Sequence, residues 1–304
     1  MTILVTGSAG FLGRHVTSTL AAEGHRVTGL DLRAADPAER GDIRSPLWSK
    51  RFSGVETVVH LAALGGVAPS LQRTAAYEIT NVRGTGHVLE AASRAGVRRV
   101  VVASSSSIYG ECPEPAAESR RPCPLSPYAR TKVAAEACAA SYAWRGLEVV
   151  VLRPFTVYGP GQRDDMLVAR MLRGEAVTLW DFERDFTPVA DVAAAIARAA
   201  TVPMAGRYEV FNIGTGRPVT ARALVDAVAE ATGRRPEVSW GGRRPAEPVR
   251  TWADPSRARR VLGFEVTSSL AEGIAAQAEA QVLDGESRVI APDSPSRTRT
   301  LSPA

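Results

Sequence analysis

The opening stretch "TILVTGSAGFLGRHVTSTL" constrains the fold of this chain more than any other segment. An apolar, β-branched run over 2–7 leads into Gly7, Gly10 and Gly13, and apolar residues with helical spacing follow over 10–24. Gly7 permits a tight turn, Gly10 lets the backbone approach a pyrophosphate, and Gly13 allows close packing of helix on strand. The stretch therefore predicts a dinucleotide site at the N-terminus of the first helix.

Strand-like and helix-like segments alternate after this opening. Continuous apolar runs, expected to be strands, occupy 25–32, 55–63, 97–105 and 147–154, and helices are expected at about 71–95 and 127–145. Strands that are apolar on both faces and separated by helices are typical of a parallel sheet with helices on both sides. The sequence therefore predicts an α/β fold with a Rossmann-type doubly wound parallel sheet.

Acidic residues after the second strand indicate which dinucleotide binds. Asp31 ends the strand-like run over 25–32, where a carboxylate bonds the ribose hydroxyls and repels a 2′-phosphate. This favours NAD over NADP, although Arg33 points the other way because an arginine there can accept a 2′-phosphate. Asp42 is a candidate for the adenine edge, and a surface acid explains it almost equally well.

Composition narrows the class of protein. The chain has 304 residues, of which 45% are hydrophobic, enough for a substantial core. We expect neither a signal peptide nor a membrane span, since no leader-like segment or long apolar stretch occurs. Cys112, Cys123 and Cys138 are not spaced like metal ligands, which favours a reduced cytoplasm and predicts no metal site. The net charge of +5 comes with scattered arginines and no nucleic-acid motif, so nucleic acid is not an expected partner.

Two features point to redox chemistry at an alcohol. Tyr128 and Lys132 are four residues apart and share one helix face. Lys132 is one of only two lysines among the 37 basic residues, so a lysine at this position is unusual for this chain. A compact ammonium there, with an oxidised nicotinamide, favours the phenolate of Tyr128 as a base. The serine run over 103–107 follows a predicted strand, at the edge where ligands bind, so a hydroxyl there can contact a substrate alcohol.

With these features, the chain resembles extended short-chain dehydrogenase/reductases of the NAD-dependent epimerase/dehydratase family. The resemblance rests on "GSAGFLG", "HLAA", "NVRGT", "SSSSIYG", "SPYARTK", "LRPFTVYGPGQ", "RDFTPVADV", "FNIGTG" and "RTWADPSRARRVLGF", in this order over nearly the whole chain. It implies Ser105 as the catalytic hydroxyl, Tyr128 as the base and Lys132 as its partner. It also implies that the cofactor is lined by Gly7, Gly10, Phe11, Leu12, Gly13, Asp31, Asp42, Ile43, Leu61, Ala62, Ala63, Asn81, Tyr128, Lys132 and Pro154.

The same resemblance suggests a nucleotide-sugar substrate. Arg184 and Arg244 would grip its diphosphate, which suits the bidentate geometry of guanidinium groups. Family dehydratases follow the catalytic hydroxyl with an Asp-Glu pair, whereas this chain has Ser106 and Ser107, which counts against a 4,6-dehydratase. Near 163–184 the chain departs from the family pattern: it is a few residues shorter and lacks the usual Gly-Asp-Gly tip. This departure leaves the nucleotide open.

The later motif is similar to that of UDP-glucuronate 4-epimerases. In those enzymes the residues matching Thr156 and Arg163, with the hydroxyls matching Ser105, Ser106 and Ser107, hold the sugar carboxylate. Oxidation at carbon 4 makes a β-keto acid that readily loses carbon dioxide, so an epimerase must keep the carboxylate out of alignment with the carbonyl π system. The alternative interpretation of Arg163 is a surface loop arginine in an arginine-rich chain.

The expected reaction is a 4-epimerisation of UDP-glucuronate to UDP-galacturonate through a transient 4-keto sugar, with NAD retained. Open alternatives are a UDP-glucose-type 4-epimerase, a nucleotide-uronate decarboxylase, a 4-ketoreductase and, outside enzymes, an NAD-binding regulator. The resemblance further implies a homodimer formed through the helices near 71–95 and 127–145.

The domain assignment follows from these sites. Residues 1–155 are assigned mainly to the NAD-binding Rossmann domain, and 156–285 mainly to a smaller C-terminal α/β subdomain that binds the nucleotide sugar. A strand near 210–213 is expected to return to the Rossmann sheet, and helices are expected at 220–233 and 256–264. The polar segment 286–304 is predicted to be a flexible tail.

Overall fold

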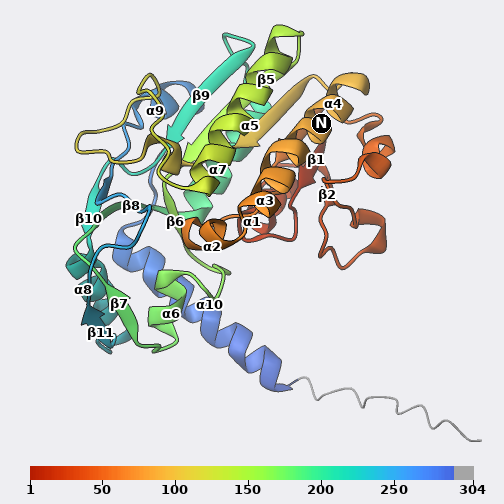
Figure 1. Cartoon of the computed structure of the whole chain (residues 1–304). Helices are drawn as coiled ribbons and strands as arrows, with labels where there is room; N and C mark the ends of the chain where they lie inside the picture. Colours follow the sequence, from red (N-terminus) through yellow and green to blue (C-terminus); the bar gives the residue numbers. More distant parts are fainter. Residues whose placement is uncertain (291–304) are drawn as a thin grey trace, which may run out of the picture.

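A six-stranded parallel sheet is the main feature of the computed structural model, which describes residues 1–290 (Figure 1). The strands lie in the order β2-β1-β3-β4-β5-β9, and every neighbouring pair is parallel. They are β1 (Thr2–Thr6), β2 (Arg26–Leu30), β3 (Thr57–His60), β4 (Arg99–Ala103), β5 (Glu148–Pro154) and β9 (Tyr208–Ile213). The predicted α/β class and doubly wound parallel sheet are confirmed.

Helices cover both faces of the sheet, which explains why its strands are apolar throughout. Successive residues of a strand point to opposite faces. On one face Ile3 and Val5 pack with residues of α1 (Phe11–Ala22) and α7 (Val189–Thr201). On the other face Leu4 packs with residues of α4 (Gly84–Arg94), α5 (Pro127–Trp144) and the 3-10 segment η2 (Pro46–Phe52).

The strand order changes direction at β1, because the chain passes to β2 on one side and later to β3 on the other. In open α/β sheets, ligands bind in the crevice outside the carboxyl ends of the strands at such a point. Gly7 directly follows β1 and Leu61 directly follows β3. The topology therefore brings the glycine loop and the segment over 61–63 to one crevice.

The prediction of a single helix over about 71–95 is wrong in detail, because the structure has several helical pieces there. The segment consists of α2 (Val67–Gln72), α3 (Thr74–Tyr77), a π-helical turn η3 (Glu78–Arg83) and α4. Arg73 separates the first two pieces because its backbone leaves the helical region, at φ −131° and ψ 36°. The π-helical turn carries Asn81, which is buried, and such turns are frequent at functional sites.

A second, smaller group of elements has its own core beside the large sheet (Figure 1). Strand β8 (Glu183–Pro188) pairs with β6 (Thr156–Tyr158), β10 (Pro218–Thr220) and β12 (Arg250–Thr251), and β7 (Val177–Leu179) pairs with β11 (Val238–Trp240). Its helices are α6 (Leu167–Leu172), α8 (Ala221–Thr232) and α10 (Leu270–Ile290). Trp180, Phe182 and Leu224 are buried in this core.

The segment 156–285 contributes to both groups. Strand β9 pairs with β5, while α7 and Ala258 and Leu262 of α9 (Ser256–Leu262) pack in the core of the large sheet. Residues 286–290, assigned to the tail from sequence, form the end of α10, and the rest of that tail, 291–304, lies outside the described residues. Within residues 1–290, every helix is too short or too polar to span a bilayer.

Candidate active site

The glycine loop after β1 is packed too closely to accommodate side chains. Gly7 has φ +74°, in the left-handed region, and a Cβ there would lie 2.7 Å from the backbone nitrogen of Ala62. A Cβ on Gly13 would lie 2.0 Å from the carbonyl oxygen of Gly7. Gly10 immediately precedes α1 and donates its N–H to the Gly7 carbonyl at 3.0 Å. The loop therefore presents backbone at the N-terminus of α1, as a pyrophosphate site requires.

Asp31 is buried just after β2 and is bonded to the glycine loop. Its Oδ2 accepts the N–H of Ala9 at 3.1 Å, and its Oδ1 accepts the N–H of Arg33 at 2.7 Å. The side chain of Arg33 is exposed. These bonds hold the carboxylate near the first turn of α1, which begins with Phe11 and Leu12. A fixed carboxylate at this place can accept the ribose hydroxyls of a dinucleotide.

Asp42 and Ile43 lie in a loop whose backbone is held by two aromatic side chains. Nε1 of Trp48 donates to the Asp42 carbonyl, and Nδ1 of His87 lies 3.0 Å from the Ile43 carbonyl. The Asp42 carboxylate pairs with Arg44 at 2.6 Å, and that guanidinium lowers the pKa of the carboxyl. The carboxylate that the sequence assigned to the adenine edge thus already has a cationic partner.

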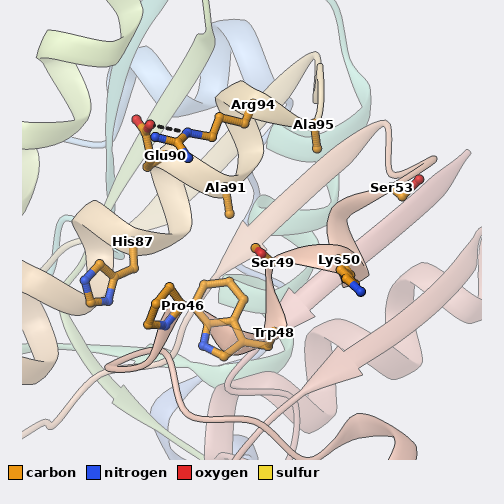
Figure 2. A pocket seen from close by; sticks show the side chains of 10 residues that line it. All are labelled: Pro46, Trp48, Ser49, Lys50, Ser53, His87, Glu90, Ala91, Arg94 and Ala95. Carbon is orange, nitrogen blue, oxygen red and sulfur yellow. Dashed lines mark hydrogen bonds and ion pairs between the residues drawn. The ribbon is translucent and has the colours of Figure 1, made fainter.

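A cavity of about 360 Å³ lies beside this loop, between η2 and α4 (Figure 2). Trp48, His87 and Lys50 line it, together with Arg94, which turns toward Glu90 and pairs with it at 2.5 Å. Its described lining includes no residue predicted for cofactor or substrate. The cavity is therefore distinct from the site predicted from the sequence.

Asn81 holds the segment that follows β3. Its Oδ1 accepts the N–H of Leu64 at 2.8 Å, and its Nδ2 donates to the Leu64 carbonyl at 2.9 Å and to Oγ1 of Thr131 at 3.1 Å. The amide thereby connects η3 to helix α5 and fixes the chain just after Leu61, Ala62 and Ala63. Asn81 acts here by positioning the wall of the crevice.

Helix α5 brings the predicted catalytic residues to the carboxyl end of β4. Ser126 caps the helix, because its Oγ accepts the N–H of Ala129 at 3.1 Å. One turn apart on α5, Tyr128 is hydrogen-bonded to Ser105, and Lys132 donates from Nζ to the Ala103 carbonyl at 2.8 Å. Nζ of Lys132 lies 5.9 Å from the centre of the Tyr128 ring. The structure thus brings Ser105, Tyr128 and Lys132 together.

Burial is the main influence on the pKa values of Tyr128 and Lys132. Burial raises the pKa of Tyr128 above its ordinary value, and the hydrogen bond with Ser105 lowers it only in part. Burial also lowers the pKa of Lys132 to about 8, against the opposing charge of Glu136. The ammonium is directed to the Ala103 carbonyl. The expected phenolate depends on the added charge of an oxidised nicotinamide, so it stays a prediction.

The remaining serines and the end of β5 lie next to this group. The Ser107 hydroxyl donates to Oγ of Ser105 at 2.9 Å, while Ser106 is buried in the same 3-10 turn, η4 (Ser106–Tyr109). Pro154 is the last residue of β5, and Thr156, half-buried, begins β6. Ser105 therefore connects the Ser107 hydroxyl with Tyr128.

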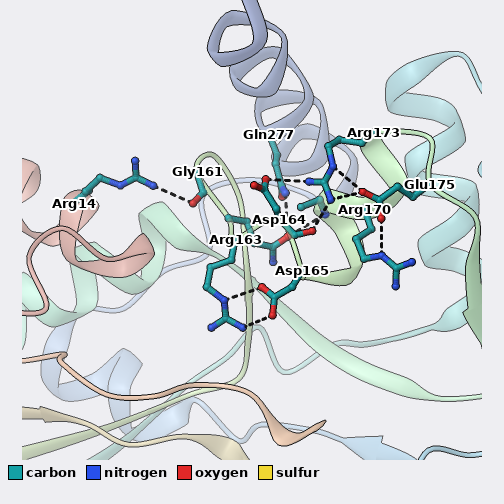
Figure 3. A network of polar contacts seen from close by, with 11 residues as sticks. Arg14, Gly161, Arg163, Asp164, Asp165, Arg170, Arg173, Glu175 and Gln277 are labelled. Atoms are coloured by element: carbon teal, nitrogen blue, oxygen red, sulfur yellow. Dashed lines mark hydrogen bonds and ion pairs between the residues drawn. The ribbon is translucent and has the colours of Figure 1, made fainter. Parts of the chain in front are cut away.

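Arg163, from the loop between β6 and α6, lies near Tyr77 and Tyr128, whose rings are edge to face with centres 6.2 Å apart. Burial raises the pKa of both tyrosines, and the positive charge of Arg163 opposes this in part. A Cβ on Gly65 would lie 3.2 Å from Nη1 of Arg163. In this structure the guanidinium is paired with Asp165 (Figure 3).

Arg184 and Arg244 form a second cluster around Trp180. Their guanidinium carbons lie 6.0 Å and 5.0 Å, respectively, from the centre of the Trp180 ring. Arg184 is buried and donates to the carbonyls of neighbouring strands, whereas Arg244 is exposed and donates to the Thr178 carbonyl at 3.1 Å. Glu247 lies 3.7 Å from Arg184. Both arginines therefore lie against the same aromatic ring.

Comparison with known proteins places this site in a family. The model of the NAD dependent epimerase/dehydratase family matches residues 3–214.

The chain belongs to the NAD dependent epimerase/dehydratase family.

Individual relatives of this family member are similar over most of their length. A UDP-glucuronate 4-epimerase from Thermodesulfobacterium geofontis is 32% identical over 313 residues, which cover 89% of this chain and 93% of the relative. MoeE5, solved with UDP-glucuronic acid and NAD, is 42% identical with a TM-score of 0.89, over 93% of this chain and 100% of that one. MoeE5 has also been solved with UDP-glucose and NAD. A UDP-glucuronic acid 4-epimerase from Bacillus cereus, solved with UDP-glucuronic acid and NAD, is 30% identical with a TM-score of 0.87, over 93% and 99% of the two chains.

Sequence reasoning missed three residues of this epimerase-family site. Glu136 continues the four-residue spacing of Tyr128 and Lys132, a signal that was available. Asp165 lies two residues after Arg163, so its pairing with that arginine could also have been considered from the sequence. Tyr77 gave no signal, because its approach to Tyr128 depends on the interrupted helix between β3 and α4.

Proposed function

We propose that this member of the epimerase/dehydratase family is an NAD-dependent 4-epimerase that interconverts UDP-glucuronate and UDP-galacturonate. One observation carries the proposal: Arg163 packs against Gly65, whose carbonyl bonds Tyr77, and the Tyr77 ring packs on that of Tyr128. An acid group on the sugar and the reacting hydroxyl can therefore be held together. The relatives that act on or bind UDP-glucuronate support the same substrate.

The crevice at β1 and β3 fits NAD. Backbone fills the places where a Cβ of Gly7 or Gly13 would clash, and Asp31 is held for the ribose. NAD would be held by Gly7, Gly10, Phe11, Leu12, Gly13, Asp31, Asp42, Ile43, Leu61, Ala62, Ala63, Asn81, Tyr128, Lys132 and Pro154. NAD supplies the acceptor that takes the hydride from carbon 4 of the sugar and returns it to the opposite face.

The chain's own residues handle the proton. Tyr128 takes the proton of the sugar 4-hydroxyl as that carbon is oxidised and gives a proton back when the carbonyl is reduced. Ser105, bonded to Tyr128, donates a hydrogen bond to the oxygen that becomes the carbonyl. Lys132 places a positive charge one helical turn from Tyr128, which favours the phenolate form that can accept this proton.

The residues that bind the uronate carboxylate decide whether the 4-keto sugar is reduced to an epimer or loses carbon dioxide. Arg163, Thr156, Ser106 and Ser107 would hold the uronate carboxylate away from the orientation in which its bond to the ring aligns with the 4-keto π system. A carboxylate held out of that alignment is not lost as carbon dioxide, so the sugar returns as an epimer.

UDP-glucose is the second candidate substrate. The bidentate pair of Arg163 with Asp165 leaves no unpaired charge beside a neutral sugar, which favours a site that also accepts one. MoeE5, solved with either sugar nucleotide, supports this alternative.

The remaining assignments complete the proposal. Arg184 and Arg244, on Trp180, would bind the diphosphate of the substrate, with no nucleic acid or membrane as partner. Helices α4 and α5 would form a homodimer, for which the 92% exposed Trp144 at the end of α5 is a suitable contact. The protein would work in the cytoplasm. Light scattering of the purified protein tests the dimer.

The decisive experiment is to incubate the purified protein with UDP-glucuronate, without added NAD, and to follow the products by proton NMR. A mixture of UDP-glucuronate and UDP-galacturonate supports the epimerase and the retained cofactor. Formation of a pentose nucleotide would mean that the protein is a decarboxylase and would overturn the epimerase proposal. No turnover with UDP-glucuronate, but turnover with UDP-glucose, would favour the second candidate.

A further inference from the structure

The guanidinium of Arg163 already holds a carboxylate in this structure. Its Nε donates to Oδ1 of Asp165 at 2.9 Å and its Nη2 donates to Oδ2 at 3.0 Å (Figure 3). Two parallel hydrogen bonds of this kind are the geometry in which arginine binds a free carboxylate. Asp165 therefore satisfies Arg163 in the manner that a uronate carboxylate would.

This ion pair lies at the edge of the catalytic cluster. Arg163 packs over Gly65, whose carbonyl accepts the hydroxyl of Tyr77 at 2.8 Å, and its charge acts on Tyr128. The Asp165 side chain is 58% exposed, so it can turn into solvent without breaking a buried contact. A competing carboxylate in the site could thus take its place on Arg163.

The loop that carries the pair is held at both ends, which leaves the side chains free to exchange partners. On one side, Arg14 of α1 donates to the Gly161 carbonyl at 3.1 Å, and Nε2 of His15 lies 2.8 Å from the Pro160 carbonyl. On the other side, Arg173 pairs with Asp164 at 3.1 Å (Figure 3). The guanidinium can therefore change carboxylates while the backbone around it stays in place.

From these contacts we propose that Asp165 is a built-in competitor of the substrate carboxylate and sets the preference of the site between acidic and neutral sugars. The inference rests on the proposed function and deepens it. A uronate must displace Asp165 to reach Arg163, so its binding is weakened by the strength of the internal pair. A neutral sugar leaves the pair intact and is bound without that penalty.

The test compares wild type, Asp165→Asn and Asp164→Asn, each as the purified NAD-containing protein. Calorimetry measures the Kd of UDP-glucuronate and of UDP-glucose, and NMR measures turnover. Because exposed ion pairs contribute at most about 1 kcal/mol, Asp165→Asn is expected to tighten UDP-glucuronate by about two- to fivefold and to leave UDP-glucose within about twofold. Asp164→Asn removes the same charge from the next residue, which bonds Arg173, and is expected to change the ratio of the two Kd values little.

Two results would overturn the inference. Weaker binding of UDP-glucuronate by Asp165→Asn would mean that Asp165 orients Arg163 for the substrate. An equal change for both sugars, or the same change in Asp164→Asn, would mean a general effect of charge. Failure of the proposed function is distinguishable, because it appears in the wild type as binding without formation of UDP-galacturonate, whereas the Kd ratio between variants tests Asp165 alone.

Discussion

The carboxylate of Glu136 receives two hydrogen bonds from the guanidinium of Arg153, of 3.0 Å from Nε and 2.7 Å from Nη2. Both side chains are buried, and Glu136 lies one helical turn beyond Lys132 on α5. The charge of Glu136 raises the pKa of Lys132 against the larger effect of burial, which lowers that pKa to about 8. The ion pair thus places a fixed negative charge behind the ammonium of Lys132.

We expect Glu136→Gln to lower the pKa of Lys132 further, because burial is then unopposed. If activity needs the ammonium, the alkaline fall of kcat/KM moves to lower pH, and Glu136→Asp retains the wild-type profile. Stability should also fall by about 3–5 kcal/mol, since Arg153 loses its buried partner.

The matched control for this prediction is Glu148→Gln, which removes an acid paired with the buried Arg99 on the large sheet. It is expected to cost stability without moving the pH profile. An unchanged profile in Glu136→Gln, measured under conditions where the variant is folded, would reduce Glu136 to a structural role.

Tyr128→Phe is expected to lower kcat by about 10²- to 10⁴-fold, because the group that exchanges the proton of the sugar hydroxyl is lost. The fold should be retained, since the ring stays buried against Tyr77. The control is Tyr77→Phe, which removes only the hydroxyl bonded to the Gly65 carbonyl and is expected to cost less than about tenfold. Near-normal turnover of Tyr128→Phe would remove Tyr128 from the mechanism.

His60 makes the stability of the protein depend on pH. It is buried between Oγ1 of Thr6, at 2.7 Å, and Oγ1 of Thr85, at 2.9 Å, and burial, helped by the charge of Lys132, lowers its pKa to about 3. The unfolded chain binds a proton near pH 6.5 and the folded chain does not, so stability falls as pH drops from about 6.5 toward 3. Between pH 7 and 5 this loss is about 2 kcal/mol.

Urea unfolding at the two pH values tests this prediction with His60→Gln, which should lose about 2 kcal/mol of the pH dependence. Thr57→Val, at another buried polar residue of β3, is the control and should alter stability equally at both pH values. Nitrogen NMR of the imidazole gives an independent measurement. Protonation of His60 in the folded protein near pH 6 would contradict the prediction.

Gly13→Ala is expected to abolish retention of NAD, because the added Cβ would lie 2.0 Å from the Gly7 carbonyl oxygen and must displace the loop. The measurement is the amount of NAD released on denaturing the purified protein, together with its melting temperature. Gly242→Ala, where a Cβ meets open space, is the control and should stay within about 0.5 kcal/mol of wild type. Full NAD content in Gly13→Ala would show that the loop does not approach the cofactor.

Local patterns predicted the large sheet well. Each strand of that sheet lies within or close to an expected run, because apolar residues on both faces are characteristic of a covered parallel sheet. The helix expected over 71–95 was wrong in detail, since its π-helical turn carries Asn81, which bonds Leu64 in the segment after β3. A propensity pattern contains no information about such contacts.

Which residues lie together at the candidate site was easier to predict from the sequence than their pKa values. The spacing of Tyr128 and Lys132 placed both on one helix face, and the structure agrees. The expected phenolate stays a prediction, because it depends on the charge of an oxidised nicotinamide as well as on burial, which raises the pKa of Tyr128. Burial is a property of the packed molecule and cannot be read from residue spacing.

The sequence by itself determined what lies close along the chain: the turn at Gly7, the tight packing at Gly13, and the shared helix face of Tyr128 and Lys132. These follow from backbone sterics and from the repeat of the helix, which act over a few residues. Only the tertiary structure decided that Tyr77 packs against Tyr128, and that Arg153 holds Glu136 behind Lys132. Those contacts depend on how whole layers pack, where many small interactions together fix the position of each side chain.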